Sequence, residues 1–338
     1  MTAGRSRLRV YLTHTPEARA NYYGDEALAK LREAAEVTLN ETDRHRSGRE
    51  LAEAAAGCDA IVSYRLSHGP AAVFENAPDL VAFLRCAVDI RDVDVPAASA
   101  QGVLVTRATP GFVPAVMELV LGMMVDLARG VSAATGRYHR GEMPEVRMGR
   151  QLAGSTLGVI GYGAIGRRLA DAGLALGMRV LVSDPHARAE DPRLSQVELP
   201  DLLSAADFVV CLAVANERTE NLMDAAAFRR MKRGAFFLNP SRGNLVDEPA
   251  LRAALDSGHL AGAALDVGRA PDQMPTPELA AHPRVVATPH VGGLTPEAAL
   301  HQAMDTVRQV AALAAGRLPD GAVNAEAAHR LARLGIKA

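Results

Sequence analysis

The chain has 338 residues, of which 49% are hydrophobic and 22% are charged, and its formal net charge is −2. A single hydrophobic core rarely grows beyond about 250–300 residues, so this length predicts two domains. The composition excludes a disordered chain, and the absence of any Lys/Arg-rich block excludes the basic surface that nucleic-acid binding requires.

The N-terminal segment, Met1 to Tyr11, carries three arginines and only a short apolar stretch. That stretch is too short for the core of a signal peptide or for a membrane span. We therefore expect a cytoplasmic protein with no membrane partner.

In the first third of the chain, short apolar runs alternate with segments of helical composition, among them 26–35 and 49–56. Strands that alternate with helices are typical of a parallel α/β sheet. We predict strands at Leu8–Thr13, Val37–Asn40, Ala60–Ser63, Val81–Ala87 and Gly102–Val105.

A long apolar run rich in Met and Leu follows at Pro114–Val131. Glu118 and Asp126 interrupt it, so we predict a buried helix that links two domains and not a membrane span. Residues 136–154 are polar, basic and glycine-containing, which predicts a loop or an extended arm.

A second series of strands and helices then begins and ends in an Ala-rich helix at Pro296–Ala315. Six strand candidates at roughly even spacing match the strand number of a dinucleotide-binding sheet. They are Leu157–Ile160, Arg179–Ser183, Phe208–Leu212, Ala235–Leu238, Ala261–Leu265 and Arg284–Ala287.

Cysteine and histidine patterns argue against disulfides and metals. Cys58, Cys86 and Cys211 lie far apart and include no C-x-x-C pair, so we expect small core residues. The ten histidines show no H-E-x-x-H or H-x-x-x-H spacing, so we expect no metal site.

A glycine-rich turn, GYGAIG at residues 161–166, lies between the first strand of the second series and a helical stretch at 167–176. In a dinucleotide-binding turn the first glycine makes the bend, the second lets the backbone approach a pyrophosphate, and the third packs the helix against the strand. The start of the helix adds amide donors and a favourable dipole. The residues that we expect to bind the cofactor here are Gly161, Gly163, Ala164, Ile165 and Gly166.

Asp184 follows the next predicted strand, eighteen residues after Gly166. A carboxylate about 20 residues beyond the glycines accepts a hydrogen bond from the ribose 2′-hydroxyl and repels a 2′-phosphate. This position therefore favours NAD over NADP. Arg188 lies close by in the sequence and keeps the use of NADP open.

Three further polar residues each follow a predicted strand: Arg242 in NPSRGN, Asp266 in LDV and His290 in TPHVGG. The carboxyl ends of strands in an open α/β sheet face the ligand crevice, so these side chains are expected to cluster there. Taken singly, Arg242 also fits a surface ion pair, Asp266 a helix or turn cap, and His290 a packed loop residue.

Together with the glycine motif, these segments resemble the D-isomer-specific 2-hydroxyacid dehydrogenase family over about residues 85–315. The resemblance implies an NAD-dependent oxidoreductase acting on a 2-hydroxyacid and its 2-oxo acid. It also implies that Arg242 holds the substrate carboxylate and carbonyl, that His290 is the acid/base, and that Asp266 contacts the nicotinamide carboxamide. The residue types suit these roles, because arginine matches a carboxylate bidentately and histidine exchanges protons near neutral pH.

The same resemblance implies two Rossmann-like domains with parallel sheets, the cofactor domain being inserted into a discontinuous, flavodoxin-like substrate domain. We place the substrate domain at residues 1–107 and 299–338 and the NAD-binding domain at 108–298. The resemblance places the active site in the cleft between them. It also implies a homodimer formed through the cofactor domain.

The sequence departs from the family pattern near the acid/base. Relatives carry a glutamate a few residues after the position of Asp266, where it pairs with the histidine, but here Ala270 stands in its place. Without that carboxylate the charged imidazole is less favoured, so we predict a weaker proton donor in the reducing direction unless Asp272 or another acid replaces it.

A second departure lies at residues 86–94, which match a glycine-rich turn that binds the substrate carboxylate. We expect Val88, Asp89 and Arg91 to contact the substrate. Asp89 would repel a carboxylate and Arg91 would attract one, so a substrate unlike the common small 2-hydroxyacids is expected. The alternative is that the side chains of Asp89 and Arg91 both face solvent.

Two other functions remain open at this point. One is an NAD(H)-responsive binding protein of the same fold without catalysis, which the missing glutamate favours and the retained Arg242 and His290 oppose. The other is an enzyme that reduces a bulkier or aromatic 2-oxo acid, which differs only in the shape of the pocket.

Overall fold

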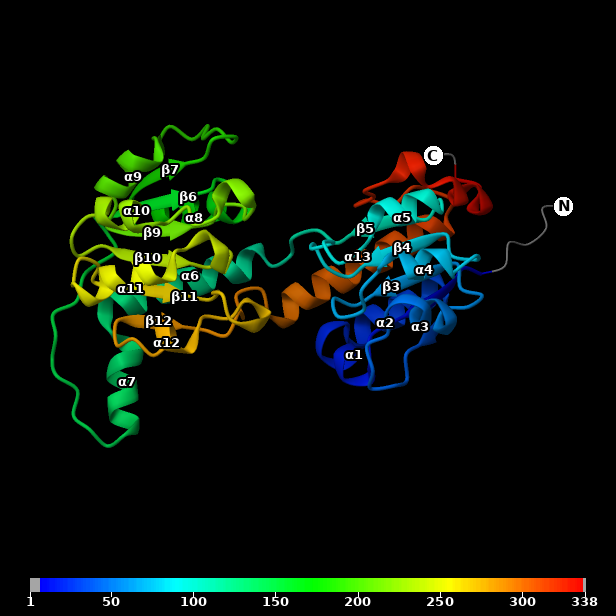
Figure 1. Cartoon of the computed structure of the whole chain (residues 1–338), viewed down its shortest axis with the longest axis horizontal. Helices are drawn as coiled ribbons and strands as arrows, with labels where there is room; N and C mark the ends of the chain where they lie inside the picture. The colour runs from blue at the N-terminus through cyan, green and yellow to red at the C-terminus, as the bar shows by residue number, and fades with distance from the viewer. Residues whose placement is uncertain (1–6, 337–338) are drawn as a thin grey trace. The chain divides into compact units, whose positions relative to one another are not determined.

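The computed structural model describes residues 7–336 and divides into two compact units (Figure 1). The first unit contains the chain up to Gly111 and again from Pro296 onward, and the second is Phe112–Thr295. Each unit contains one parallel sheet, which confirms the predicted α/β class. The first six residues of the N-terminal segment lie outside the described residues. Within 7–336, no helix combines the length and apolar character needed to cross a membrane.

The first unit is built on a five-stranded sheet with the order β2-β1-β3-β4-β5, every neighbouring pair being parallel. This is the strand order of flavodoxin-like folds, as predicted. The strands are β1 (Arg9–Leu12), β2 (Glu36–Leu39), β3 (Ala60–Ser63), β4 (Ala82–Arg85) and β5 (Leu104–Arg107). The last strand starts two residues later than expected, because Gly102 has a left-handed φ of 70° and still belongs to the preceding turn.

Helices cover both faces of this sheet. One core lies under α2 and α13 and includes Leu31 and Val310, whereas the core on the other face includes Leu51 and Phe74 from α3 and α4. Covered on both faces, β3 and β4 are buried at every position, which explains why each is apolar up to its last residue. The helices are α1 (Pro16–Tyr22), α2 (Gly24–Ala34), α3 (Gly48–Ala54), α4 (Ala71–Glu75), α5 (Val95–Ala100) and α13 (Pro296–Ala314).

The second unit is built on a seven-stranded parallel sheet. The strands are β6 (Thr156–Ile160), β7 (Arg179–Ser183), β8 (Ser195–Gln196), β9 (Phe208–Cys211), β10 (Phe236–Asn239), β11 (Gly262–Leu265) and β12 (Val285–Ala287). They lie in the order β12-β11-β10-β9-β6-β7-β8, which is the dinucleotide-binding order with one strand added at the β12 edge. The strand order reverses between β6 and β9, and ligands bind at such a switch point. The six predicted strands are present, and β8 is additional.

Two layers of helices cover this sheet. Helices α6 and α8 share one core, and α9, α10, α11 and α12 share the other. The predicted buried helix is α6, whose Val116, Val120 and Met124 face the core at four-residue spacing. The helices are α6 (Val113–Arg129), α7 (Val131–His139), α8 (Ala164–Ala175), α9 (Leu199–Ala205), α10 (Ala225–Arg230), α11 (Glu248–Asp256) and α12 (Pro277–Ala280).

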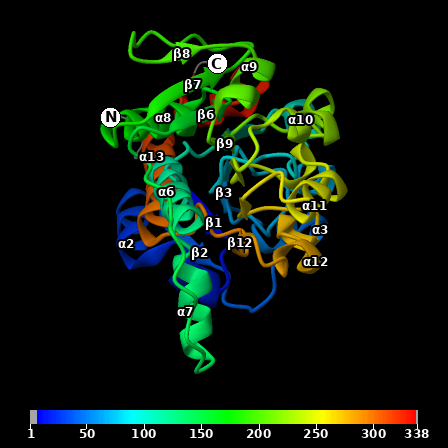
Figure 2. The same cartoon turned by 90° about the vertical axis from the view of Figure 1, so that its left-hand side faces the viewer.

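The prediction of a loop or arm over 136–154 was wrong at its start. Gly130 ends α6 in the left-handed conformation, with φ 67°, and α7 begins at the next residue and continues to His139. Figures 1 and 2 show α7 projecting from the second unit, and Figure 1 shows the chain after it returning as an extended arm to β6. The arm exposes Met143, Val146 and Met148.

All three cysteines are buried and free, as expected of small core residues. Burial raises the pKa of both Cys86 and Cys211 to about 12. Neither thiol therefore ionises near neutral pH, so neither is a reactive nucleophile there.

Candidate active site

The glycine turn joins β6 to α8 at the point where the strand order of the second sheet reverses. Gly161 has φ 95°, and a Cβ placed on it would lie 2.5 Å from the carbonyl oxygen of Leu212 at the end of β9. A Cβ on Gly166 would lie 2.2 Å from the carbonyl oxygen of Gly161. Both positions therefore require glycine, the first for the bend and the third for close packing of α8.

The second glycine faces open space. A Cβ on Gly163 would meet no heavy atom within 4 Å, so a ligand can approach the backbone here. Gly163 is also the N-cap of α8 and supplies no side-chain cap. The first helical N–H groups, at Ala164, Ile165 and Gly166, lack intrahelical acceptors and point outward with the positive end of the helix dipole. These features fit the pyrophosphate of a dinucleotide.

Asp184 follows β7 and holds the glycine turn. Its carboxylate accepts hydrogen bonds from the backbone N–H groups of Tyr162 at 2.7 Å and of His186 and Ala187 at 2.8 Å. Partial burial alone would raise the pKa of Asp184, but the three N–H donors outweigh it and lower the pKa below its usual value. The carboxylate is therefore ionised and fixed beside the turn, as a ribose partner must be.

Arg242 follows β10 in an extended conformation, with φ −147°, just before a short 3-10 turn at Gly243–Leu245. Its Nη1 donates to the carbonyl of Ser241 at 2.7 Å, and Asn239 donates to the carbonyl of Arg242 at 2.9 Å. Arg242 as a whole residue is half-buried. The local hydrogen bonds orient the turn that carries it.

The loops after β10 and β11 touch at two glycines. A Cβ on Gly243 would lie 2.0 Å from the carbonyl oxygen of Gly268, so the backbone next to Arg242 packs directly on the backbone after Asp266. Since β10, β11 and β12 are neighbours in the sheet, the structure brings the residues after these strands, Arg242, Asp266 and His290, to one edge.

Asp266 is 2% exposed and organises the loop that carries His290. Its Oδ1 accepts from the hydroxyl of Thr288 at 2.6 Å and from the N–H of Val291 at 2.8 Å, and its Oδ2 accepts from the N–H of Gly292 at 2.8 Å. The N–H of His290 donates to the carbonyl of Asp266 at 2.9 Å. The carboxylate is thus a structural partner of the His290 loop.

His290 is a half-buried residue with a left-handed φ of 55°. Its Nδ1 lies 2.8 Å from the main-chain carbonyl oxygen of Asp272. Where relatives are expected to place a carboxylate, this chain therefore presents a neutral carbonyl. Sequence reasoning did not find this contact, since a main-chain carbonyl has no residue-type signature.

The residues predicted to bind substrate lie in the first unit, after β4. Arg91 donates through Nε to both carboxylate oxygens of Asp89, at 2.9 Å and 3.0 Å, and both side chains are exposed. Val88 is half-buried. Asp89 and Arg91 therefore neutralise much of each other's charge.

Sequence reasoning missed Arg85, the last residue of β4. Its side chain is 3% exposed, pairs with Asp92 and donates to the carbonyls of Tyr64 and Arg65 at 2.8 Å. It therefore ties the loop after β3 to the turn that carries Asp89 and Arg91. The available signal was a single cation ending an otherwise apolar run, AFLR.

Comparison with known proteins identifies relatives over most of the chain. Residues 121–292 match the family described as D-isomer specific 2-hydroxyacid dehydrogenase, NAD binding domain. The (S)-sulfolactate dehydrogenase of Chromohalobacter salexigens is 35% identical over 286 residues, which cover 82% of this chain and 91% of that protein. The hydroxypyruvate reductase of Thermotoga maritima is 30% identical over 289 residues, which cover 82% and 94%. The apo-structure of D-lactate dehydrogenase from Escherichia coli is 26% identical, with a TM-score of 0.77, and covers 94% of this chain and 100% of that one.

Proposed function

Because the chain belongs to the D-isomer-specific 2-hydroxyacid dehydrogenase family, we propose that Arg242 binds the substrate carboxylate and carbonyl and that His290 is the acid/base. The protein is an NAD-dependent dehydrogenase, as the resemblance predicted. The observation that carries the proposal is the single edge of the second sheet to which β10, β11 and β12 bring Arg242, Asp266 and His290.

In the reducing direction, the guanidinium of Arg242 pairs with the carboxylate of the 2-oxo acid and polarises the adjacent carbonyl. When bound, the nicotinamide supplies the hydride to the carbonyl carbon. His290 gives a proton to the oxygen that becomes the hydroxyl, and in the oxidising direction it takes that proton back. Asp266 holds the His290 loop, and this contribution is independent of any contact with the nicotinamide.

We propose NAD as the preferred cofactor over NADP. The ionised Asp184 carboxylate, fixed by three backbone N–H groups, would repel a 2′-phosphate. Arg188 is exposed on the following turn, which still offers a cation to NADP.

For the substrate, we propose that Val88, Asp89 and Arg91, which belong to the substrate domain predicted as 1–107 and 299–338, contact the substrate. The Asp89–Arg91 pair lowers the repulsion that Asp89 alone would exert on a carboxylate. A 2-oxo acid with a larger or charged substituent at C3 suits this turn better than a small apolar one, and one relative acts on (S)-sulfolactate.

We propose that two copies associate through α6 and α7. Val125, Val131 and Leu176 are 43%, 53% and 42% exposed and line a hollow of about 750 Å³ between these helices and the end of α8. Exposed apolar side chains that gather at one hollow favour contact with a partner surface over a fully solvated face. The expected cytoplasmic location stays a prediction.

The test follows NADH absorbance while the purified protein meets a panel of 2-oxo acids: glyoxylate, hydroxypyruvate, sulfopyruvate and phenylpyruvate. We expect turnover with at least one acid and a loss of about 100-fold or more in kcat/KM for Arg242→Ala. Arg252→Ala, an exposed arginine paired with Asp256, is the matched control and should retain the wild-type rate.

Tight NADH binding without turnover of any acid would contradict the proposal and support the alternative of an NAD(H)-responsive binding protein. That alternative is not favoured, because the named relatives are dehydrogenases and reductases. Turnover that survives in Arg242→Ala would instead remove the proposed role of this arginine.

A further inference from the structure

The contact between His290 and Asp272 defines which ring nitrogen carries the proton. A carbonyl oxygen only accepts hydrogen bonds, so the 2.8 Å contact requires a hydrogen on Nδ1 of His290. The neutral ring then has its lone pair on Nε2. This nitrogen is the one available to exchange a proton with the substrate oxygen.

The loop that presents this carbonyl is held in an unfavourable backbone conformation. Asp272 and Gln273 have φ values of 56° and 58°, a left-handed pair without glycine, and His290 itself has φ 55°. Each such residue costs about 1–2 kcal/mol, so the surroundings must hold it. The N–H of Gly268 donates to the carbonyl of Gln273 at 2.8 Å, and the N–H of Ala270 donates to Met274 at 3.0 Å.

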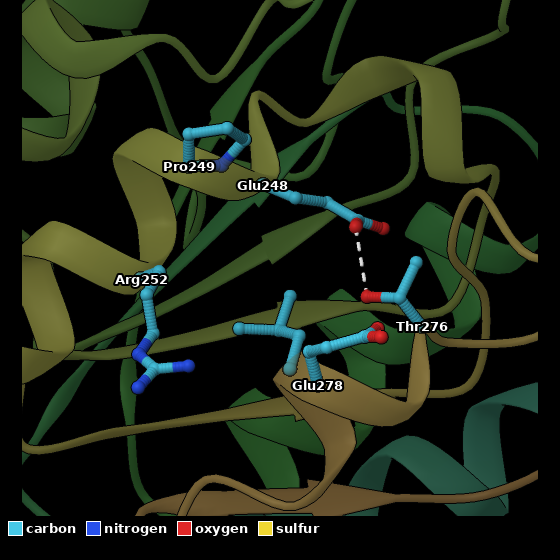
Figure 3. Close-up of a pocket in the computed structure, with 6 residues that line it drawn as sticks. Glu248, Pro249, Arg252, Thr276 and Glu278 are labelled. Carbon is cyan, nitrogen blue, oxygen red and sulfur yellow. Dashed lines mark hydrogen bonds between the residues drawn. The ribbon is translucent and has the colours of Figure 1, made fainter.

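Two charged side chains, Glu248 and Arg269, form hydrogen bonds that hold the loop containing Asp272. Glu248, the first residue of α11, accepts from the N–H of Arg269 at 3.1 Å and from the hydroxyl of Thr276 at 2.9 Å, so one carboxylate holds both ends of the loop. Figure 3 shows Glu248 pointing to Thr276. Both residues line a pocket of about 250 Å³, as do Arg252 and Glu278.

Arg269 connects the loop to the turn that follows Arg242. Its guanidinium donates to the carbonyls of Asn244 at 3.2 Å and of Val246 at 3.1 Å, and to Glu220 at 2.9 Å. The same arginine therefore joins the segment that carries the proposed substrate-binding cation to the segment that faces the proposed acid/base.

From these contacts we propose that the main-chain carbonyl of Asp272 fixes the Nδ1–H tautomer of His290, and that Glu248 and Arg269 are positioning residues that hold this carbonyl in place. The inference rests on the proposed role of His290. In oxidation, the proton of the alcohol passes to Nε2 and the Nδ1 proton stays where it is. In reduction, the imidazolium form, which carries a proton on each nitrogen, gives its Nε2 proton to the carbonyl oxygen and returns to the Nδ1–H tautomer.

The test reads the tautomer directly, by long-range ¹H–¹⁵N correlation spectra of the full-length protein labelled with ¹⁵N-histidine. His290→Asn assigns the signal. At a pH where the ring is neutral, the wild type should show the proton on Nδ1. Asp272→Asn keeps the main-chain carbonyl and removes the charge, and should show the same tautomer.

Removal of either positioning side chain, Glu248 or Arg269, should weaken the hydrogen bond between the His290 ring and the Asp272 carbonyl. In Glu248→Ala and Arg269→Ala we expect a mixture shifted toward Nε2–H, together with a fall in kcat of about tenfold or more, because a histidine in the wrong tautomer cannot serve as the base. Glu248→Gln keeps an acceptor and should restore most of both readouts. Glu278→Ala, in the same pocket, is the control, and melting curves confirm that each variant is folded.

A wild-type ring protonated on Nε2 would overturn the inference, as would an unchanged tautomer in both Glu248→Ala and Arg269→Ala. A tautomer lost in Asp272→Asn would assign the role to the carboxylate and likewise overturn it. If the wild type shows Nδ1–H but turns over no 2-oxo acid, the contact is supported and the proposed function fails, so the two failures are distinguishable.

Discussion

The buried carboxylate of Asp266 and the backbone of His290 form one unit, since the carbonyl of Asp266 accepts from the N–H of His290 at 2.9 Å while its side chain accepts from the next two residues. His290 has a φ of 55°, a left-handed conformation that is uncommon for residues other than glycine. The three hydrogen bonds that Asp266 accepts, from His290, Val291 and Gly292, hold His290 in this conformation. A substitution of the Asp266 side chain should therefore displace His290, although that side chain makes no hydrogen bond to His290 itself.

We predict that Asp266→Asn lowers both stability and turnover. An amide NH2 replaces one acceptor oxygen, so at least one buried donor among Thr288, Val291 and Gly292 loses its partner, at a cost of about 1–3 kcal/mol in the free energy of unfolding. A displaced His290 should lower kcat by about 100-fold. Urea unfolding and steady-state kinetics measure the two effects.

Asp43→Asn is the matched control, because Asp43 is exposed in the loop after β2. Its free energy of unfolding should stay within about 0.5 kcal/mol of the wild type. Wild-type stability and kcat in Asp266→Asn would show that the carboxylate does not support the His290 loop.

We predict that Asp184→Ala weakens the discrimination between NADH and NADPH. The substitution removes the negative charge that would face a 2′-phosphate and also the acceptor for three backbone N–H groups. The ratio of kcat/KM for NADPH over NADH should rise about tenfold or more, which corresponds to about 1.4 kcal/mol. Kinetics with both cofactors at one ionic strength give this ratio.

The protonation of Asp184 gives a second check on the same residue. Its pKa lies below the usual value, so the charge persists in the folded protein at pH values where an ordinary carboxyl group is already protonated. The stabilisation that the Asp184 carboxylate gives the folded protein is present above the unfolded-state pKa of about 3.9 and is lost as the pH falls through the lower folded-state value.

An unchanged ratio of kcat/KM for NADPH over NADH in Asp184→Ala would show that this carboxylate does not determine the cofactor preference.

The sequence predicted the sheets well and their ends less well, for a physical reason. The predicted bounds of Ala60–Ser63 and Arg179–Ser183 agree with the structure, because each strand has a run of three buried apolar residues. The two-residue strand Ser195–Gln196 has no apolar pattern and depends on its pairing with β7. The helix Val131–His139 was hidden because a left-handed Gly130 separates it from α6.

For the site, the sequence could supply residue types but not their contacts. The positions of Arg242, Asp266 and His290 after neighbouring strands follow from motif order, and their chemical roles remain predictions. The contact of His290 with the Asp272 carbonyl depends on a left-handed turn formed by two residues other than glycine. No pattern of residue types predicts such a turn, so the contact could be found only in the folded structure.

We predict that His14 makes the first unit sensitive to acid. It is fully buried, both ring nitrogens lack a hydrogen-bond partner within the described residues, and the ring packs among aromatic rings that include Tyr23 and Tyr64. Burial, with smaller contributions from Arg19, His45 and Arg85, lowers the pKa of His14 to about 3. The folded protein therefore keeps this ring neutral where the unfolded chain takes up a proton.

The sign follows from that difference. Because the folded-state pKa is below the unfolded value of 6.5, the contribution of His14 is constant above pH 6.5 and becomes destabilising as the pH falls toward 3, by about 1.4 kcal/mol per pH unit. Between pH 6.5 and 5 the wild type should lose about 2 kcal/mol more than His14→Phe. Urea unfolding at the two pH values measures this, and parallel losses in both proteins would refute it.

We predict that Val131→Glu separates the proposed dimer. Val131 is 53% exposed at the start of α7, beside the hollow that Val125 and Leu176 also line. In a two-fold symmetric interface the same patch meets itself, so one substitution introduces two charges into a contact without a partner for either.

Light scattering after size-exclusion chromatography should show two chains for the wild type and one for the variant at micromolar concentration. Leu318→Glu, at an apolar position of the first unit that is 45% exposed, should remain a dimer. A wild type of one chain at every concentration would reject the dimer, and an unchanged mass for Val131→Glu would move the interface away from α7.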